Sequence, residues 1–435
     1  RAVFPSRLCI FTRVPRPTAA QLRYQRHEIA ALIHFNMATF QKDGDPGCTK
    51  DNWLAKSYRL IHFNPTKLNT TQWAEVMQNL GAKHAILTAK HGCGFGLWQS
   101  DYKFSDGSEY GYDVAGGFGR DVLREFSDSM EQAGIGHGFY YSLTNNFFLN
   151  NRVLFPYCDN SCPSLLCAAE FEDLAVHQVE ELWSKYGALD EIWFDGGYTG
   201  SLKDKLSALL AKYQPNATAF GGDGVSPSPA CWVGTESGEP GAEIWSTGTD
   251  SHGDPDSQVF CPKTCDTTLQ DGDAWFYKEG LSIRSLSTMI AVYHATVGMN
   301  GVLELDFAID RTGRVHDSHA ELYKALGDWV RACYGTPVAQ QANRTNEVTL
   351  PAGTPIDRVT LSEDIAEGQL IRSFTVQVMP KGGFEWKVVA KGQSVGNKRI
   401  VLFDKIDAEK VKVSVDEAVG TPYLSVKIHA PCASE

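Results

Sequence analysis

Short apolar segments alternate with amphipathic segments over roughly the first three quarters of this chain. The segments 30–35, 84–89, 136–142, 191–194, 218–221 and 302–307 have the length and composition of buried strands. Residues 69–80, 121–132 and 169–186 carry apolar side chains at helical spacing. Strands that alternate with helices form parallel sheets, because each helix covers the sheet between two strands. The order predicts an α/β fold, a (β/α)8-like TIM barrel over residues 1–335, although periodicity alone does not fix the number of strands.

The pattern changes near residues 334–342. Beyond them, short alternating runs at 358–361, 374–379, 385–389, 410–415 and 424–428 are separated by Gly, Pro, Asp and Lys. No helical pattern of useful length is evident there. Alternation with period two is typical of strands with one buried face, so residues 340–435 are predicted to form an antiparallel β-sandwich domain.

The balance of charges restricts the class of partner. The 435 residues include 52 acidic and 40 basic side chains, which gives a formal net charge of −12. No basic run is present to neutralise phosphates, which argues against nucleic acid and anionic membranes as partners. No apolar run reaches the roughly 18 residues that a membrane-spanning helix needs. A neutral substrate such as a sugar fits this composition, and the oligomeric state stays open.

The cysteine content favours an oxidising compartment. Among eleven cysteines, Cys158, Cys162 and Cys167 cluster within ten residues, and Cys261 and Cys265 lie four apart. These spacings fit zinc-binding motifs poorly, so local disulfide bonds are expected. The count is odd, which leaves at least one cysteine unpaired.

Other features agree with secretion. Sequons for N-glycosylation begin at Asn69, Asn216 and Asn343. The chain opens at Arg1 without an initiator methionine, as expected if a signal peptide has been removed. We therefore predict a secreted, extracellular glycoprotein with disulfide bonds.

One predicted strand delivers an aspartate. Asp195 follows the apolar run 191–194 directly, and Gly196 and Gly197 come next. In a (β/α)8 barrel, side chains at the carboxyl ends of the strands face the mouth where active sites lie. A carboxylate in that place can attack the anomeric carbon of a sugar. The structural alternative is that Asp195 ends the strand or caps the following helix.

Two histidines also stand at the ends of predicted strands. His34 ends the first strand, and His91 leads into a glycine-rich loop that contains Trp98. A sugar site needs aromatic faces for C–H surfaces and polar groups for hydroxyls, which His91 and Trp98 supply. Both histidines have an alternative interpretation as satisfied core residues. The loop lacks the Lys-Ser/Thr ending of a phosphate-binding loop.

A second carboxyl group is expected from residues 231–243. A strand-like run there leads to Glu236, with Glu239 and Glu243 as competitors. A glutamate in a partly apolar cleft has a raised pKa and can act as a general acid. Further along, Trp275 belongs to a dense aromatic cluster that either packs in the core or holds the apolar face of a deoxy sugar.

Together these segments resemble the α-L-fucosidases of glycoside hydrolase family 29. The likeness covers about residues 25–335. The matching motifs are residues 32–37 with 39–40, 73–98, 193–196, 232–238 with 245–246, 275–277, and 297–301 through 310–313.

The resemblance implies a role for each candidate. Asp195 would be the catalytic nucleophile and Glu236 the acid/base residue of a double displacement, with no metal and no organic cofactor. The other side chains implied in substrate binding are His34, His91, Trp98, Tyr141, Trp275 and Glu239.

The chain departs from the family pattern in two places. Gly92 and Cys93 stand where the family has a second histidine and an acidic residue. Thr264 stands where the branch that prefers α-1,3/1,4 linkages has a glutamate. These departures leave the linkage and the aglycone preference open.

The resulting expectation is an exo-acting retaining fucosidase that releases terminal α-L-fucose from glycans or plant cell-wall oligosaccharides. Two alternatives stay open, namely a fucose-binding protein on an inactive barrel and a glycoside hydrolase for another sugar such as galactose. A metal-dependent hydrolase is disfavoured, because the histidines form no HxH or HExxH pair.

Overall fold

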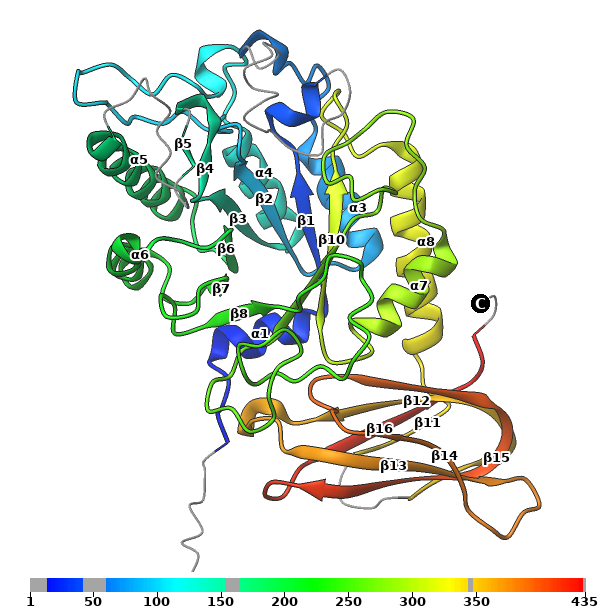
Figure 1. The fold of residues 1–435 in the computed structure, drawn as a ribbon. Helices are drawn as coiled ribbons and strands as arrows, with labels where there is room; N and C mark the ends of the chain where they lie inside the picture. Colours follow the sequence, from blue (N-terminus) through cyan, green and yellow to red (C-terminus); the bar gives the residue numbers. More distant parts are fainter. Residues whose placement is uncertain (1–13, 42–59, 150, 153–163, 343–346, 433–435) are drawn as a thin grey trace, which may run out of the picture.

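The computed structural model describes residues 14–41, 60–149, 151–152, 164–342 and 347–432. Eight parallel strands close into a barrel in the order β1-β10-β9-β8-β7-β6-β3-β2, which confirms the predicted TIM barrel (Figure 1). The strands are β1 (Ile29–His34), β2 (His84–Lys90), β3 (Gly136–Ser142), β6 (Glu191–Asp195), β7 (Thr218–Phe220), β8 (Pro229–Trp232), β9 (Lys263–Thr267) and β10 (Val302–Ala308).

Helices surround the barrel and also lie at its amino-terminal end. Figure 1 shows α1 (Ala19–His27) below the strands. The outer helices are α3 (Thr70–Leu80), α4 (Val122–Ala133), α5 (Ser164–Lys185), α6 (Gly200–Tyr213), α7 (Leu286–Ala295) and α8 (Asp317–Tyr334). The loops carry the short elements η1 (Met37–Phe40), η2 (Leu60–His62), η3 (Val114–Gly116), η4 (Phe147–Leu149), β4 (Asn145–Asn146) and β5 (Asn151–Arg152).

Local sequence sets the ends of the outer helices. Asn69 caps α3 by accepting a hydrogen bond from the Gln72 amide, and Asp121 caps α4 in the same way. Gly81 and Gly134 end these helices in the left-handed conformation, which glycine adopts without steric cost. The predicted helices at 69–80 and 121–132 are thereby confirmed to within one residue, whereas α5 begins earlier than predicted.

The region between α6 and α7 departs from regular alternation. Residues 214–285, all described, contain three barrel strands and no helix. The strand β9 reads Lys-Thr-Cys-Asp-Thr and is buried throughout. Hydropathy did not reveal this strand, because its side chains are polar although the barrel encloses them.

The C-terminal domain is an antiparallel β-sandwich, as predicted. Its strands follow the order β11-β16-β12-β15-β13-β14. The two longest strands change register along their length, and β15 pairs with β12 and with β13. The strands are β11 (Ala339–Ala342), β12 (Glu347–Glu363), β13 (Ile371–Pro380), β14 (Lys387–Gly392), β15 (Arg399–Ala418) and β16 (Leu424–His429), with η5 (Ile365–Glu367) between β12 and β13.

Specific contacts join the two domains. Arg399 donates to Glu243 at 3.1 Å, and the backbone amides of Gln393 and Ser394 lie 3.3 Å from the same carboxylate. Glu243 was a competitor for the second catalytic carboxyl group. It instead holds the barrel against the sandwich, so that alternative is excluded.

The two disulfide bonds that join described residues span longer separations than the local bonds suggested by the sequence. Cys261 bonds to Cys231, 30 residues away, and Cys265 is a buried free thiol rather than its partner. A second bond links Cys333 at the end of α8 to Cys432. Cys158, Cys162, the side chain of Cys167 and the sequon at Asn343 lie outside the described residues, so local bonds within that cysteine cluster stay a prediction.

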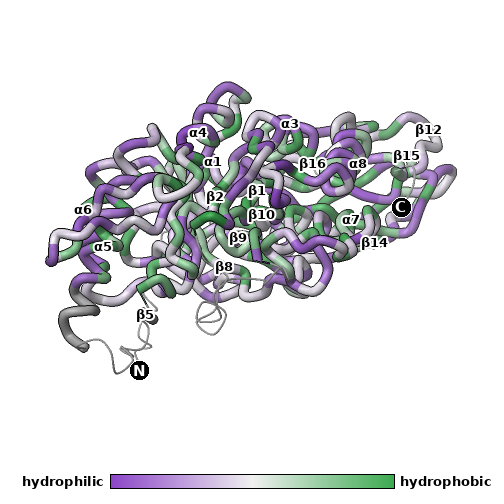
Figure 2. Tube along the Cα trace, turned by 90° about the horizontal axis from the view of Figure 1, so that it is seen from above, coloured by the Kyte–Doolittle hydropathy of each residue, from purple (hydrophilic) through white to green (hydrophobic). Residues whose placement is uncertain are grey.

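Hydrophobic residues gather around the central strands. From above, the trace is greenest near β2, β9 and β10, whereas α5 and α6 alternate between hydrophobic and hydrophilic stretches (Figure 2). None of the helices described has the length and apolar character needed to cross a membrane.

Candidate active site

A cavity opens at the carboxyl ends of the barrel strands. Its lining combines aromatic surfaces with titratable groups from six strands and their loops: Leu32, His34, His91, Tyr140, Trp193, Asp195, Glu236, Asp266 and Trp275.

Asp195 is the last residue of β6 and is half-buried in this cavity. The Tyr140 hydroxyl donates to Asp195 Oδ2 at 2.5 Å. Burial, together with the charge of Asp195, holds the pKa of Tyr140 well above its usual value, so the phenol keeps its proton. The next residue, Gly196, has φ of 69° and packs so closely on Thr144 that a Cβ would lie 2.8 Å from the hydroxyl. Glycine therefore lets the chain turn sharply behind the carboxylate.

Glu236 enters the cavity from the loop after β8. The Thr267 hydroxyl donates to its backbone carbonyl at 2.7 Å, which fixes the loop against β9. Burial raises the pKa of Glu236, a hydrogen bond with Trp275 lowers it, and the charges of Asp273 and Asp195 raise it further. The carboxyl group thus retains its proton to a higher pH than a free glutamic acid, as a general acid requires.

Two neutral histidines form one wall of the cavity. Nδ1 of His34 lies 2.9 Å from Oδ1 of the buried Asp306, which leaves Nε2 for a ligand. His91 stacks on Tyr140, with ring centres 5.5 Å apart, and its buried Nδ1 has no hydrogen-bond partner among the described residues. Burial lowers the pKa of both imidazoles, that of His91 to about 4. Near neutral pH they present uncharged nitrogens, which suit the hydroxyls of a sugar.

A third carboxyl group, that of Asp266 on β9, also lines the cavity. It is 3% exposed and accepts a hydrogen bond from Trp232 Nε1 at 2.7 Å. Burial, with added repulsion from Glu304 and Glu236, raises its pKa to about 8. Asp266 is therefore an uncharged acid at neutral pH, and can donate a hydrogen bond as well as accept one.

Two aromatic side chains predicted to contact the substrate lie outside the cavity. Trp98 is buried, and its Nε1 donates to Glu181 on α5 at 3.0 Å. The loop before it turns back along β2, where the Leu97 amide donates to the Ala89 carbonyl, and this carries Trp98 to the outside of the barrel. The expectation that Trp98 contacts the substrate is therefore corrected. Trp98 instead packs outside the barrel and supports the loop that follows β2.

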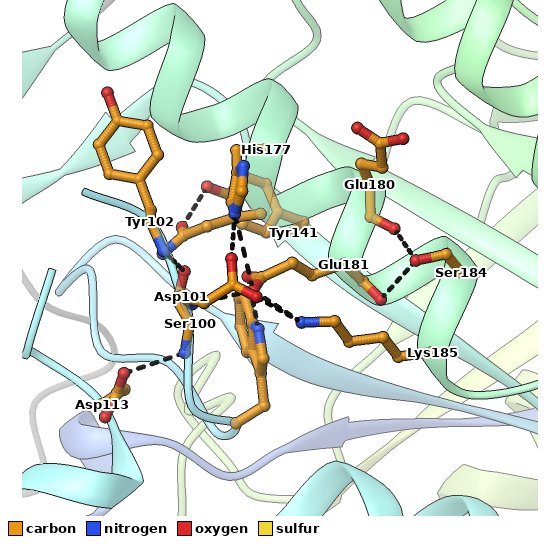
Figure 3. A network of polar contacts seen from close by, with 12 residues as sticks. Ser100, Asp101, Tyr102, Asp113, Tyr141, His177, Glu180, Glu181, Ser184 and Lys185 are labelled. Carbon is orange, nitrogen blue, oxygen red and sulfur yellow. Dashed lines mark hydrogen bonds and ion pairs between the residues drawn. The ribbon is translucent and has the colours of Figure 1, made fainter. Parts of the chain in front are cut away.

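The expectation that Tyr141 contacts the substrate is also corrected, because the neighbouring Tyr140 lines the cavity instead. Its hydroxyl donates to Gln178 on α5 at 2.7 Å, beside the polar network shown in Figure 3. Successive side chains of a strand point to opposite faces, so Tyr140 points into the barrel and Tyr141 points outward. Tyr140 takes the place predicted for Tyr141.

The structure also separates the two candidate glutamates. Both glutamates are exposed, but only Glu236 lines the cavity. His34, His91, Trp275 and Asp195 are brought together with Glu236, as the sequence suggested.

Sequence analysis missed four lining residues, namely Leu32, Tyr140, Trp193 and Asp266. A signal existed for Trp193, because it stands two residues before Asp195 and shares its face of the strand. Tyr140 is paired with Trp193 in the register of β3 and β6, which the sequence alone does not show.

Two groups of described side chains have metal-ligand chemistry, and no member of either group lines the cavity. The first is the buried set of His84, Glu191 and Glu304. The second is the set of Asp101, His177 and Glu181 at the surface. There the Lys185 ammonium lies 3.3 Å from Asp101 and 2.9 Å from Glu181, so a cation is already present between the carboxylates (Figure 3).

These features define a class of protein. A carboxyl group at the end of β6, another on the loop after β8, aromatic surfaces and neutral histidines meet at the mouth of a (β/α)8 barrel. Glycoside hydrolases use this combination, since a sugar offers C–H faces, hydroxyls and one electrophilic carbon. We conclude that the fold and the site are those of a glycoside hydrolase.

Comparison with known proteins identifies the family. The family model for alpha-L-fucosidases matches residues 49–335. Alpha-L-fucosidase 1 of Arabidopsis thaliana is 26% identical over 95% of this chain and 87% of its own length. A crystal structure from Bacteroides thetaiotaomicron that bears the provisional name alpha-L-fucosidase superposes with a TM-score of 0.85 at 26% identity, over 96% of this chain and all of the other.

A more distant structure shares the fold. A Ruminococcus gnavus glycoside hydrolase family 29 fucosidase with bound fucose has a TM-score of 0.82 at 19% identity, over 96% of this chain and 95% of the other. The family model spans well over half of the chain. The protein belongs to the α-L-fucosidase family, glycoside hydrolase family 29.

Proposed function

We propose that this protein is an exo-acting α-L-fucosidase that hydrolyses terminal α-L-fucose with retention of configuration. The observation that carries the proposal is the meeting of Asp195 and Glu236 in one cavity at the mouth of the barrel.

The chemistry proceeds in two displacements. Asp195 Oδ attacks the anomeric carbon while Glu236 gives its proton to the leaving oxygen, so a fucosyl ester forms and the aglycone departs as an alcohol. Glu236, now ionised, takes a proton from water, and the resulting hydroxide oxygen displaces Asp195 from the same carbon. Fucose leaves, Asp195 is again a carboxylate and Glu236 again an acid.

The remaining lining groups bind the sugar in this proposal. His34 and His91 accept or donate hydrogen bonds to hydroxyls through uncharged nitrogens. Trp275 offers its ring to the apolar face, and stands 5.0 Å from the His34 ring. Tyr140 holds the nucleophile. Glu239, at the exposed rim, is left for contact with the aglycone.

The substrate class is a fucosylated glycan or plant cell-wall oligosaccharide. We further propose that the protein acts outside the cell. The disulfide bonds that join described residues and the exposed sequon residue Asn216 support this location.

The decisive test replaces the nucleophile. Asp195→Asn keeps the size and shape of the side chain but cannot form the ester, so turnover of an aryl α-L-fucoside should be abolished while circular dichroism is unchanged. Near-wild-type hydrolysis by this variant would refute the role of Asp195. NMR of the first product released by the wild type should show the α-anomer.

A second test separates the two glutamates. Glu236→Ala should retain activity on fucosides with a good leaving group, lose it on disaccharides, and regain turnover with azide. Glu239→Ala is the matched control and should show none of these effects.

A panel of aryl glycosides addresses the alternatives. Turnover of an α-L-fucoside excludes an inactive fucose-binding barrel. Faster turnover of a galactoside than of the fucoside would favour a hydrolase for another sugar.

A further inference from the structure

A buried polar network lies beneath the floor of the cavity. We define the floor network as Tyr24, His84, Glu191, Trp193 and Glu304. Its members are at most 7% exposed and come from α1, β2, β6 and β10. Only Trp193 also lines the cavity. The mechanism given above uses none of the others.

Glu304 is the acceptor at the centre of the network. Trp193 Nε1 donates to its Oε2 at 3.0 Å, and the Tyr24 hydroxyl donates to its Oε1 at 2.8 Å. Both oxygens of this carboxyl group are therefore engaged by donors from opposite sides.

Glu191, in contrast to Glu304, has only one of its two carboxyl oxygens hydrogen-bonded to a described residue of another element. Its Oε2 lies 2.8 Å from His84 Nε2, and its Oε1 is buried with no assigned donor facing it. A carboxyl oxygen of Glu191 lies within 4.8 Å of a carboxyl oxygen of Glu304 in this buried group. Two carboxyl groups can share a hydrogen bond only if one of them carries a proton.

Among the described side chains, no lysine or arginine forms an ion pair with Glu191 or Glu304 that could replace this proton. Arg23 forms an ion pair with Asp190 at 2.8 Å, and burial keeps both His27 and His84 neutral by lowering their pKa. Burial raises the pKa of Glu191 to about 8 and that of Glu304 well above its usual range. The titratable and charged groups around the pair are Arg23, Tyr24, His27, Lys83, His84, Asp190, Lys263, Cys265 and Asp266.

The network reaches the nucleophile through stacked rings. Trp193 stacks on Phe220 at 3.8 Å and on Tyr140 at 5.2 Å between ring centres. Tyr140 in turn donates to Asp195. Glu304 accepts the hydrogen bond of the Trp193 indole and so fixes the position of this ring. Tyr140, which donates to the nucleophile Asp195, packs against the same ring.

We propose that Glu191 and Glu304 are joined by a shared proton and act as a positioning pair for Trp193. Through Trp193, the pair sets the place of Tyr140 and hence of Asp195. The inference rests on the proposed function for its effect on catalysis, but the shared proton can be tested without it.

A divalent cation between His84, Glu191 and Glu304 is the competing way to neutralise the network. Such an ion would have to replace the hydrogen bonds that Tyr24 and Trp193 already donate to Glu304. An increase in the stability of the wild type on addition of Zn²⁺ or Mn²⁺, reversed by a chelator, would overturn the shared proton.

Amide substitutions distinguish the two carboxyl groups. In Glu191→Gln, the new amide N–H replaces the proton as donor to Glu304, and the amide oxygen still faces His84. In Glu304→Gln, only one atom can accept, so either Trp193 or Tyr24 loses its acceptor. Glu304→Gln should therefore lower kcat/KM for an aryl α-L-fucoside by about tenfold or more, and Glu191→Gln by clearly less.

A control variant measures the effect on stability of replacing any buried glutamate by glutamine. Glu363 is a buried glutamate on β12 of the sandwich domain, 6% exposed and hydrogen-bonded to backbone amides. Glu363→Gln should lower stability without changing kcat/KM per folded molecule. A larger activity loss in Glu191→Gln than in Glu304→Gln would refute the positioning role.

The dependence of stability on pH tests the proton itself. Because the folded pKa is raised, the pair stabilises the protein fully below the unfolded value of about 4.3 and loses this contribution as pH rises towards about 8. The stability of the wild type relative to Glu191→Gln should thus fall over that window in denaturant titrations. A constant difference between pH 5 and 8 would overturn the proposal, even if the wild type hydrolyses fucosides or Glu304→Gln does not fold.

Discussion

Tyr140 and Tyr141 offer a test in which neighbouring residues receive the same change. The Tyr140 hydroxyl donates to Asp195 at 2.5 Å inside the cavity, and the Tyr141 hydroxyl donates to Gln178 at 2.7 Å outside the barrel. Replacing either by phenylalanine removes one oxygen and leaves the ring. The two variants therefore separate an effect on the nucleophile from an effect on packing.

The contact of Tyr140 sets the size of the expected loss. A hydrogen bond to a charged group contributes about 1.5–3 kcal/mol. If Tyr140→Phe loses that stabilisation in the transition state, kcat/KM should fall roughly 10- to 150-fold, at 1.36 kcal/mol for each factor of ten. The hydrogen bond from Tyr140 orients Asp195 for attack on the sugar. It also stabilises the negative charge that returns to Asp195 when the ester is hydrolysed, so both displacements are affected.

Tyr141→Phe should behave differently. Gln178 Oε1 would lose its donor in a buried place, which costs about 1–3 kcal/mol in the free energy of unfolding. The cavity and the nucleophile are untouched, so kcat/KM should stay close to that of the wild type.

The assay is steady-state hydrolysis of an aryl α-L-fucoside, with denaturant unfolding of each variant. A loss of kcat/KM in Tyr141→Phe with none in Tyr140→Phe would refute the orientation of β3 described above. Equal losses in both variants would show that the effect comes from packing rather than from the bond to Asp195.

Two further predictions concern Glu236 and its loop. Asp273 raises the pKa of Glu236, so Asp273→Asn should move the alkaline limb of kcat/KM for a fucosyl disaccharide to lower pH, and an unmoved limb would argue that this charge does not reach the acid. The bond between Cys231 and Cys261 closes a segment of 30 residues that contains Glu236. Replacing both cysteines by serine should cost about 3–4 kcal/mol of stability and impair disaccharides more than activated aryl fucosides; unchanged urea unfolding and kinetics would contradict this.

The positions of helices and strands could be predicted because their signals are local. The helix at 70–80 is specified by a cap at Asn69, apolar residues at helical spacing and Gly81 at its end. The apolar strands β1, β2, β3, β6 and β10 were recognised for the same reason. The polar strand β9 was not, because its burial comes from the closure of the barrel rather than from its own side chains.

The orientation of a barrel strand is harder to obtain. Strands of a parallel barrel are buried on both faces, so β3 shows no alternation that would tell Tyr140 from Tyr141. The sequence also gave no reason to separate Glu243 from Glu236, because the partner of Glu243 is Arg399, more than 150 residues further along.

By itself, the sequence determined the barrel, the sandwich and a short set of candidates at strand ends: His34, His91, Asp195, Glu236 and Trp275. Periodicity, capping residues and motifs act over a few residues, and they are visible in one dimension. Only the tertiary structure decided which candidates share a cavity, that Tyr140 rather than Tyr141 holds the nucleophile, and that Glu304 accepts from Trp193 beneath the floor. Those contacts join residues far apart in the chain, and they exist only once the barrel has closed and fixed the register of its strands.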